Sequence, residues 1–263
     1  MRHSTTGGAA GTRASRRGIR IAAFAVAVLA APVLLTACSA AAELPAAPEG
    51  IDAESFDGAS GNGLWLAPSS EIASIIVESV HAAGPVSMHG TVNEFILTEE
   101  GTTLPARMMT IDYAGRPSGY RARFLAGALE AQLLVDGGST RVRGNDAYAA
   151  ASGRPELTSV QCTVGTDPAA AQWAPFTEPA AVLDAVLSGA QLSVAAPDDD
   201  DETLAVQIGS SETMVGVLTV ERYGSPLPRS LSIAELEGDT ELAFTAWGDA
   251  VDLDAAAAEL PCS

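Results

Sequence analysis

The stretch ALEAQLLVDGGSTRVR, residues 128–143, has the alternation of apolar and polar residues that is typical of a β-hairpin. Its first half would place one apolar row on a single face of an extended strand: Leu129, Ala131, Leu133 and Val135. Asp136-Gly137-Gly138 is a turn sequence, and Val142 continues the apolar face beyond it, with Arg141 and Arg143 opposite. The stretch therefore predicts an antiparallel hairpin with one face toward a core and one toward solvent.

Similar period-two segments occur on both sides of this hairpin, each bounded by glycine, proline or Asp-Gly. Those before it are residues 86–97, 106–113 and 120–125. Those after it are residues 191–195, 204–208, 213–223, 227–236 and 241–247. This number of short strands predicts an antiparallel sheet.

Two segments have the helical period instead. The first begins near Ser69 and Ser70, which are suitable N-caps, and ends at Gly84-Pro85. Its apolar residues repeat on one face: Ile72, Ile75, Ile76, Val80 and Ala83. The second lies within residues 168–189 and repeats its apolar residues after Pro179. A single antiparallel sheet with helices on its apolar face is an α+β fold.

The first 37 residues have the layout of an export signal. Five arginines and no acidic residue are followed by the apolar stretch 21–35, which is too short for a comfortable membrane span. The sequence Leu35-Thr36-Ala37-Cys38 then matches the lipobox of bacterial lipoproteins, in which the cysteine thiol receives a diacylglycerol. We therefore expect Cys38 to be lipidated and the protein to be held at the extracytoplasmic face of the cell membrane. The alternative is a chance cysteine beside a signal-anchor helix.

Charge and composition exclude several classes of function. Removing residues 1–37 leaves nine basic side chains against 33 acidic ones, a formal charge of −24, which would repel nucleic acid and anionic head groups. The chain contains no lysine, so a Walker phosphate loop, a Schiff-base enzyme and a Ser-x-x-Lys acyl enzyme are excluded. It has no Gly-x-Ser-x-Gly elbow either, and we expect neither an enzyme nor a bound cofactor.

Composition also divides the rest of the chain. Residues 38–63 are rich in alanine, proline, glycine and acidic residues, and they predict a flexible tether after the lipidated cysteine. Residues 64–263 are long enough for one domain with a substantial core.

Several stretches resemble the LppX and LprG group of actinobacterial lipoproteins, which belong with the LolA and LolB lipoprotein carriers. LLVDGGSTRVRGNDAYAA, residues 133–150, is similar to a strand, turn, strand and Gly-Asn step of that group. IIVESVHAAGPVSMHGTV (75–92) is similar to its first helix and strand, and GVLTVERYGSPLPRSLSIAE (216–235) and ELAFTAWGDAVDLDA (241–255) to its closing strands. The resemblance implies a strongly curved half-barrel sheet whose concave face is covered by helices and encloses a cavity for acyl chains.

The residues that would line such a cavity come from the apolar faces of the predicted strands and of the second helix. They are Met109, Ile111, Leu129, Leu133, Val135, Val142, Val182, Leu183, Val186, Leu218 and Val220. The alternative for each is a place in a dry, filled core, because apolar periodicity predicts burial alone.

Cys162 and Cys262 remain once Cys38 is lipidated. A disulfide between them would persist outside the cytoplasm and would join the C-terminal tail to the middle of the domain. The alternative is two free thiols or a redox pair, but the chain lacks Cys-x-x-Cys spacing.

Three groups of charged or polar residues were considered as sites. Arg121, Arg123, Arg141 and Arg143 alternate on two predicted strands that could lie near one another, with Glu130 and Gln132 between them. This arrangement favours cross-strand pairing over a head-group or partner site. The acidic run at residues 198–202 lacks the spaced ligands of a calcium loop, which favours a solvated loop. His81 and His89 have no partner motif for metal, and no metal site is predicted.

Two functions follow from the sequence. The first is a membrane-anchored lipoprotein that binds the acyl chains of a lipid or lipoprotein in an apolar cavity and carries them across the envelope. The second is a structural or accessory lipoprotein with a filled core that docks a membrane-protein partner. The first needs an open pocket, and the second needs a contact patch.

Overall fold

The computed structural model describes residues 58–97, 103–209, 213–235 and 238–262. The predicted export signal, Cys38 and most of the predicted tether lie outside the described residues. All of the described elements belong to one compact unit.

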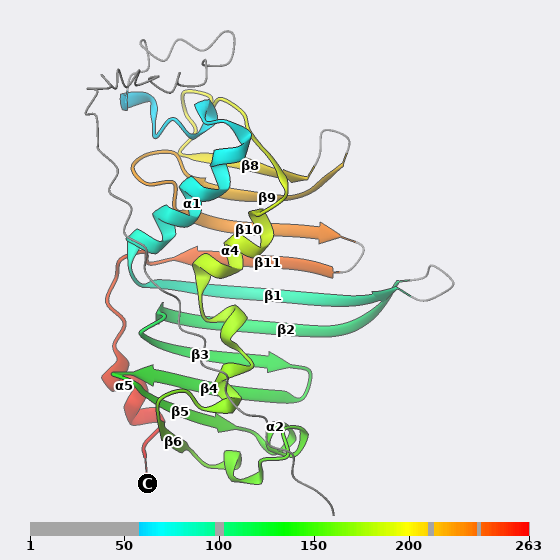
Figure 1. Cartoon of the computed structure of the whole chain (residues 1–263), viewed down its shortest axis with the longest axis vertical. Helices are drawn as coiled ribbons and strands as arrows, with labels where there is room; N and C mark the ends of the chain where they lie inside the picture. The colour runs from blue at the N-terminus through cyan, green and yellow to red at the C-terminus, as the bar shows by residue number, and fades with distance from the viewer. Residues whose placement is uncertain (1–57, 98–102, 210–212, 236–237, 263) are drawn as a thin grey trace, which may run out of the picture. The chain divides into compact units, whose positions relative to one another are not determined.

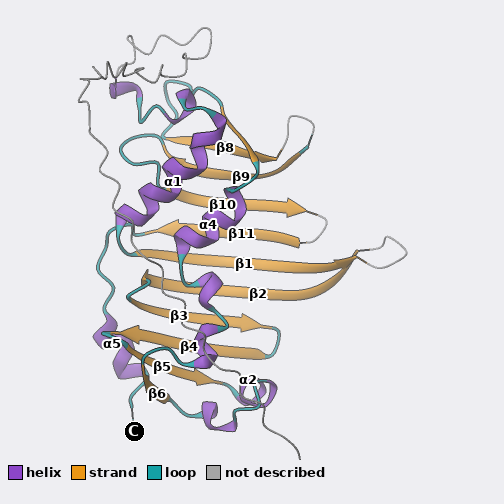
Figure 2. Ribbon diagram, in the orientation of Figure 1, coloured by secondary structure: helices purple, strands orange, loops and turns teal. Residues whose placement is uncertain are grey.

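In the described part of the chain, eleven strands form one antiparallel sheet (Figures 1 and 2). The strands are β1 (Val86–Leu97), β2 (Thr103–Arg116), β3 (Gly119–Ala126), β4 (Leu129–Asp136), β5 (Ser139–Gly144), β6 (Gln161–Val164), β7 (Gln191–Val194), β8 (Thr203–Gly209), β9 (Met214–Glu221), β10 (Pro228–Glu235) and β11 (Gly238–Thr245). Their order is β6-β5-β4-β3-β2-β1-β11-β10-β9-β8-β7, so the long strand β1 joins an N-terminal half to a C-terminal half. The predicted α+β class with one antiparallel sheet is confirmed.

The hairpin that the sequence predicted first is formed by β4 and β5. Leu133 is opposite Val142 and Val135 is opposite Thr140, so the alternation of residues 128–143 sets the register. Leu133 and Val142 are both buried, as one side of a pleated strand facing a core should be.

One face of the sheet is covered by helices (Figures 1 and 2). These are α1 (Ser69–Ala83), the short α3 (Pro168–Ala171), the 3₁₀ turn η5 (Ala174–Phe176) and α4 (Pro179–Leu187). The main core lies between this layer and the sheet, and each of the two longer helices contributes the apolar face that its period predicts. The buried residues of α1 are Ile72, Ile76 and Val80, and those of α4 are Pro179, Ala180, Leu183 and Leu187.

The start of α1 differs from the prediction. Ser69 and Ser70 do not cap the helix, because Ser69 is already its first residue and the cap position is Pro68. The Ser69 hydroxyl instead donates a hydrogen bond to the backbone carbonyl of Leu192 in β7. The serine therefore ties α1 to the edge of the sheet.

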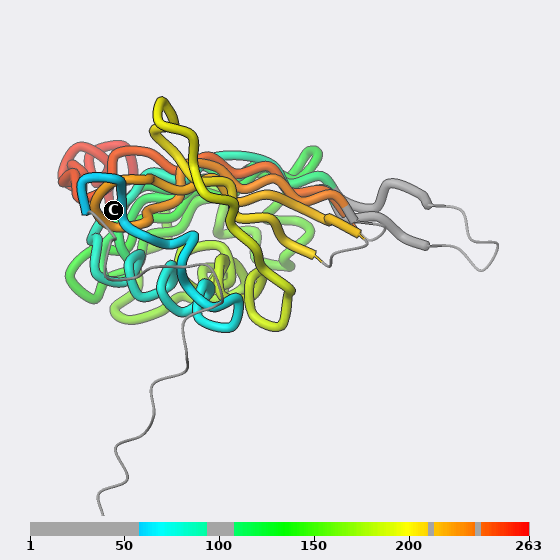
Figure 3. The backbone as a smooth tube through the Cα atoms, turned by 90° about the horizontal axis from the view of Figure 1, so that it is seen from above, coloured from blue at the N-terminus to red at the C-terminus, as the bar shows by residue number. Residues whose placement is uncertain are grey.

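The opposite face of the sheet is covered in one region by a helix that the sequence did not predict. This helix, α5 (Leu253–Glu259), lies on the other side of the sheet from α1 and α4 (Figure 3). Leu134 in β4 is 0% exposed there and packs with Ala256 and Leu260. The face of the hairpin that we predicted to be solvated is therefore covered where α5 crosses it.

Two further helical segments and one strand were also missed: α2 (Asp146–Ala151), the 3₁₀ turn η4 (Pro155–Thr158) and β6. Asn145 caps α2 with its side chain, which accepts a hydrogen bond from the Tyr148 amide. These elements are only four to six residues long, too short for a period to be visible in the sequence.

The packed region begins before Leu64, where the sequence placed the end of the tether. Residues 58–60 form the turn η2 (Gly58–Ser60), and residues 64–66 form η3 (Leu64–Leu66). The Asn62 amide donates to the carbonyl of Arg222, and the Asn62 side chain donates to the carbonyl of Glu221. Residues from Gly58 onward are therefore held against the end of β9.

None of the helices in the described ranges combines the length and the apolar character that a membrane crossing requires.

Candidate functional site

The structure brings all eleven predicted cavity residues into the main core. The fully buried ones are Met109, Ile111, Leu133, Val142, Leu183, Leu218 and Val220. The partly buried ones, which pack against that core, are Leu129, Val135, Val182 and Val186. Val135 also lines one of two adjacent pockets described below. Their role in holding an acyl chain stays a prediction.

The larger of these pockets, which we call the α1–α4 pocket, lies at the end of the sheet where β2 turns into β3. Its volume is about 360 Å³. Its walls come from the last turn of α1, the start of β1, the end of β2, the start of α4 and Trp247. The lining residues are Val80, His81, Ala82, Gly84, Val86, Gly115, Arg116, Pro117, Glu178, Pro179, Ala180 and Trp247.

Trp247 is held in place at this pocket by its neighbours. Its indole N–H donates to the carbonyl of Pro228 at 2.8 Å, and its ring stacks on Phe244, with 6.2 Å between the ring centroids. A fixed indole beside Val80, Val86 and Pro179 gives the pocket a firm apolar wall.

The second pocket, which we call the α3 pocket, has a volume of about 240 Å³ and lies under α3 and η5. Its lining residues are Pro117, Tyr120, Val135, Gly138, Thr140, Gly165, Thr166, Ala170, Ala171, Ala174, Thr177 and Glu178. Pro117 and Glu178 line both pockets, so the two are adjacent. Each is a hollow between the sheet and the helix layer.

Two tyrosines lie beside this shared wall. Tyr113 and Tyr120 pack with ring centroids 5.3 Å apart, and Tyr113 is 0% exposed. The Tyr113 hydroxyl has no hydrogen-bond partner among the described residues. Burial raises the pKa of Tyr113 well above its usual range, and the nearby Tyr120 and Glu178 raise it further. This hydroxyl is therefore an unsatisfied polar atom close to Glu178.

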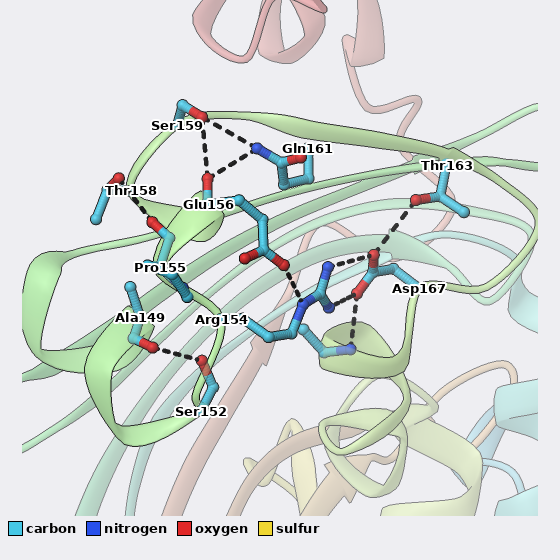
Figure 4. A network of polar contacts seen from close by, with 11 residues as sticks. Ala149, Ser152, Arg154, Pro155, Glu156, Thr158, Ser159, Gln161, Thr163 and Asp167 are labelled. Carbon is cyan, nitrogen blue, oxygen red and sulfur yellow. Dashed lines mark hydrogen bonds and ion pairs between the residues drawn. The ribbon is translucent and has the colours of Figure 1, made fainter.

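The wall of the α3 pocket is fixed by a polar network around Arg154 and Asp167 (Figure 4). The Arg154 guanidinium donates to Asp167 at 2.6 Å and to Glu156 at 2.8 Å. Asp167 also accepts from the Ala169 amide at the start of α3, at 2.7 Å. Burial alone would raise the pKa of Asp167, but the hydrogen bonds from Arg154 and the Ala169 amide outweigh it and lower the pKa. Because α3 begins at this carboxylate, the network positions Ala170 and Ala171 at the pocket.

The four strand arginines lie on the outer face of the sheet, and three of them have internal partners. Arg123 forms an ion pair with Glu130 at 2.8 Å, and Arg143 donates to Gln132 at 2.6 Å. Arg141 donates to the carbonyls of residues 257 and 260 at the end of α5. These contacts agree with the predicted structural role, although Arg141 pairs with a helix end and not with a cross-strand carboxylate. Arg121 is exposed and lines a groove beside α5.

The acidic run at residues 198–202 surrounds a buried arginine. Arg222 is 5% exposed, and its Nη1 donates to the backbone carbonyls of Asp198 and Asp201 at 2.5 and 2.8 Å. Its Nε donates to the carbonyl of Ser60 at 2.8 Å. The carbonyls of this loop therefore bind a guanidinium. In the described residues, no group of three or more His, Cys, Asp or Glu side chains could hold a metal ion.

The cysteines and histidines have separate places in the structure. Cys162 and Cys262 form the predicted disulfide, with a Cα–Cα distance of 5.9 Å, which ties the C-terminal tail to β6. His81 is exposed and lines the α1–α4 pocket, whereas His89 is exposed on β1.

Most of the pocket residues were missed by the sequence reasoning. Arg116 is the last residue of β2, Pro117 follows it, Glu178 precedes α4, and Trp247 follows β11. Alternation identifies the interior of strands, and these residues lie at or just beyond the ends of strands and helices. The Trp-Gly step at residues 247–248 and the helix stop at Gly84-Pro85 are the sequence signals close to the pocket.

Comparison with known proteins finds similarity at the level of structure. No family model matches the chain, and no curated protein sequence matches it. Among solved structures, the chain matches the crystal structure of LprF from Mycobacterium bovis, an LppX/LprG-family lipoprotein, at 12% sequence identity and a TM-score of 0.38, over 70% of this chain and 95% of that one.

Proposed function

We propose that this protein is a lipoprotein that binds the acyl chains of a lipid in the hollow between its sheet and its helix layer. The observation that carries the proposal is the pair of adjacent pockets, about 360 and 240 Å³, that share Pro117 and Glu178. Ligand pockets in proteins typically have volumes of roughly 300–1,000 Å³ and mostly apolar walls. Val80, Val86 and Trp247 supply such a wall in the larger pocket.

The proposal includes the setting that the sequence predicts. A lipid on Cys38 holds the protein at the extracytoplasmic face of the membrane, and residues between Cys38 and Gly58 connect it to the domain. The sheet curves around the helix layer as a half-barrel, and the bound lipid is carried between the membrane and the outer envelope.

One observation favours the alternative, an accessory lipoprotein with a filled core. Leu133 and Leu218, which we predicted to line the cavity, are at most 1% exposed and lie in the main core cluster. A core that is already filled at these positions leaves acyl chains only the two pockets near the sheet end. A test must therefore probe the pockets and not the centre of the core.

The test fills the pockets from residues that are exposed, so that folding is preserved. Ala82→Trp would place an indole in the α1–α4 pocket and Ala171→Trp in the α3 pocket, and both alanines are exposed. Ala258→Trp, on the exposed side of α5, is the matched control. Residues 47–263, secreted so that the disulfide forms, are loaded with a fluorescent acyl phospholipid and the bound fraction is measured.

We expect the unsubstituted domain and Ala258→Trp to bind about one lipid per chain, and at least one pocket variant to lose most of that binding. If the two pocket variants bind as well as the control, the pockets are not the lipid site. If even the unsubstituted domain takes up no lipid, the proposal of lipid binding is overturned.

A further inference from the structure

Two opposite charges line the α1–α4 pocket without pairing with each other. Arg116 and Glu178 are both exposed and both belong to the pocket wall, yet no ion pair joins them or ties either one to another described residue. Arg116 therefore has no partner among the described residues that would compete with a ligand in the pocket.

The other arginines show how unusual this is. Among those whose side chains the structure describes, the partnered ones are Arg123, Arg141, Arg143, Arg154, Arg222 and Arg229. Only the guanidinium groups of Arg116 and Arg121 form no side-chain hydrogen bond or ion pair within the described ranges. Arg121 lies in the groove beside α5, on the other face of the sheet. Arg116 is thus the free guanidinium of the pocket.

A guanidinium binds phosphate well because its donors form a planar fork, and a carboxylate binds an ammonium. A ligand with both groups on one short head would satisfy Arg116 and Glu178 together. Such a head has no net charge, so the formal charge of −24 that remains after residues 1–37 does not repel it, as it would repel an anionic lipid. The apolar wall of Val80, Val86 and Trp247 lies next to these charges and suits the first part of an acyl chain.

We infer that the α1–α4 pocket binds the head of a zwitterionic, amine-bearing phospholipid, with the phosphate at Arg116 and the ammonium at Glu178. This inference rests on the proposed function, since it names the head group of the lipid whose chains occupy the hollow. Glu178 borders the α3 pocket as well, so the ammonium would sit where the two pockets meet.

The test compares three short-chain lipids that have the same two acyl chains and differ only in their heads: phosphatidylethanolamine, phosphatidylglycerol and diacylglycerol. Binding to the secreted domain, residues 47–263, is measured by titration calorimetry below the micelle concentration. We expect phosphatidylethanolamine to bind about fivefold or more tightly than either of the others, a difference typical of added charge contacts in a partly exposed site.

Two substitutions assign the two charges. Arg116→Gln should weaken both phospholipids and leave diacylglycerol unchanged. Glu178→Gln should weaken phosphatidylethanolamine alone. Arg229→Gln is the control, because Arg229 is an exposed arginine paired with Glu221 and absent from the pocket wall.

The outcomes separate this inference from the proposed function. Equal binding of all three lipids, or phosphatidylethanolamine binding that neither substitution weakens, would overturn the head-group assignment and leave acyl binding in place. Tighter binding of phosphatidylglycerol would also overturn it. Failure of every lipid to bind would overturn both.

Discussion

Arg222 connects the end of β9 to two other backbone segments. Its guanidinium binds carbonyls from the acidic loop and from Ser60, and its own carbonyl accepts from the Asn62 amide. Removing a buried cation that donates to carbonyls lowers stability, because the carbonyl oxygens lose their hydrogen-bond donors while they remain buried.

We expect Arg222→Gln to lower the free energy of unfolding by about 3 kcal/mol, measured by urea denaturation. Arg229→Gln is the matched control, since its ion pair with Glu221 is exposed, and it should cost less than about 1 kcal/mol. Equal effects of the two substitutions would show that the carbonyl shell around Arg222 is not important for stability.

Asp167 gives a prediction with a pH dependence. Its pKa is lowered in the folded protein, so its contribution to stability is present above its unfolded pKa of about 4 and is lost as the pH falls through the folded value. We expect Asp167→Asn to cost about 2–3 kcal/mol at pH 7. The difference from the unsubstituted protein should stay constant down to pH 5 and shrink below pH 4, in urea titrations at each pH. A difference that does not shrink would contradict the ion pair with Arg154.

At the residue scale, the sequence predicted burial well and polar contacts poorly. Leu133 and Val142 were placed by alternation alone, and both are buried. The partners of Arg222 could not be predicted, since they are backbone carbonyls, which every residue carries. Glu178 and Arg116 were missed because a pocket wall leaves no period in the sequence.

At the scale of elements, β1 joins the two halves of the sheet, because it pairs with β2 on one side and β11 on the other. Gly90 allows β11 to approach, since a Cβ atom there would lie 1.8 Å from the carbonyl oxygen of Glu241. We expect Gly90→Ala to cost about 2–3 kcal/mol in urea unfolding. Gly58→Ala, whose Cβ would meet no atom within 4 Å, should be close to neutral. A neutral Gly90→Ala would mean that the β1–β11 pairing is looser than described.

The second prediction at this scale concerns α5 and the disulfide that follows it. Cys162 and Cys262 are 100 residues apart, and a loop of that length should stabilise the fold by roughly 3–4 kcal/mol. The free energy of unfolding of the double variant Cys162→Ser/Cys262→Ser should be lower by that amount. In this variant, the amide hydrogens of residues 253–260 should exchange faster than those of α1. Unchanged exchange in α5 would show that Leu134 and Arg141 hold the helix without the disulfide.

Ten of the eleven described strands and the two long helices were predictable because each carries apolar alternation or a helical period between turn signals. The helix α5 was not, because a run of alanines between acidic residues has no distinct apolar face. The disulfide was predicted because the protein is expected to lie outside the cytoplasm, where disulfides persist. It joins β6 to the same C-terminal tail that contains α5.

At the scale of the whole domain, the pairing of β1 with β11 joins two halves that are far apart in the sequence. The sequence predicted one sheet without this order, since nothing local specifies which distant strands pair. The pairing places the start of β1, the end of β2 and Trp247 around one pocket. The candidate lipid site therefore depends on the order of the strands, which alternation within a single strand does not predict. The lining residues that alternation did predict lie mainly in the core.

The most direct test of lipid binding is mass spectrometry of what the protein carries when it is made in an actinobacterial host. Residues 47–263 are secreted, purified without detergent and extracted with organic solvent, and the extract is compared with that of the Ala82→Trp/Ala171→Trp double variant. We predict about one acylated lipid per chain for the unsubstituted domain and a large loss in the variant. An extract without lipid, from a domain that also resists loading, would contradict this prediction.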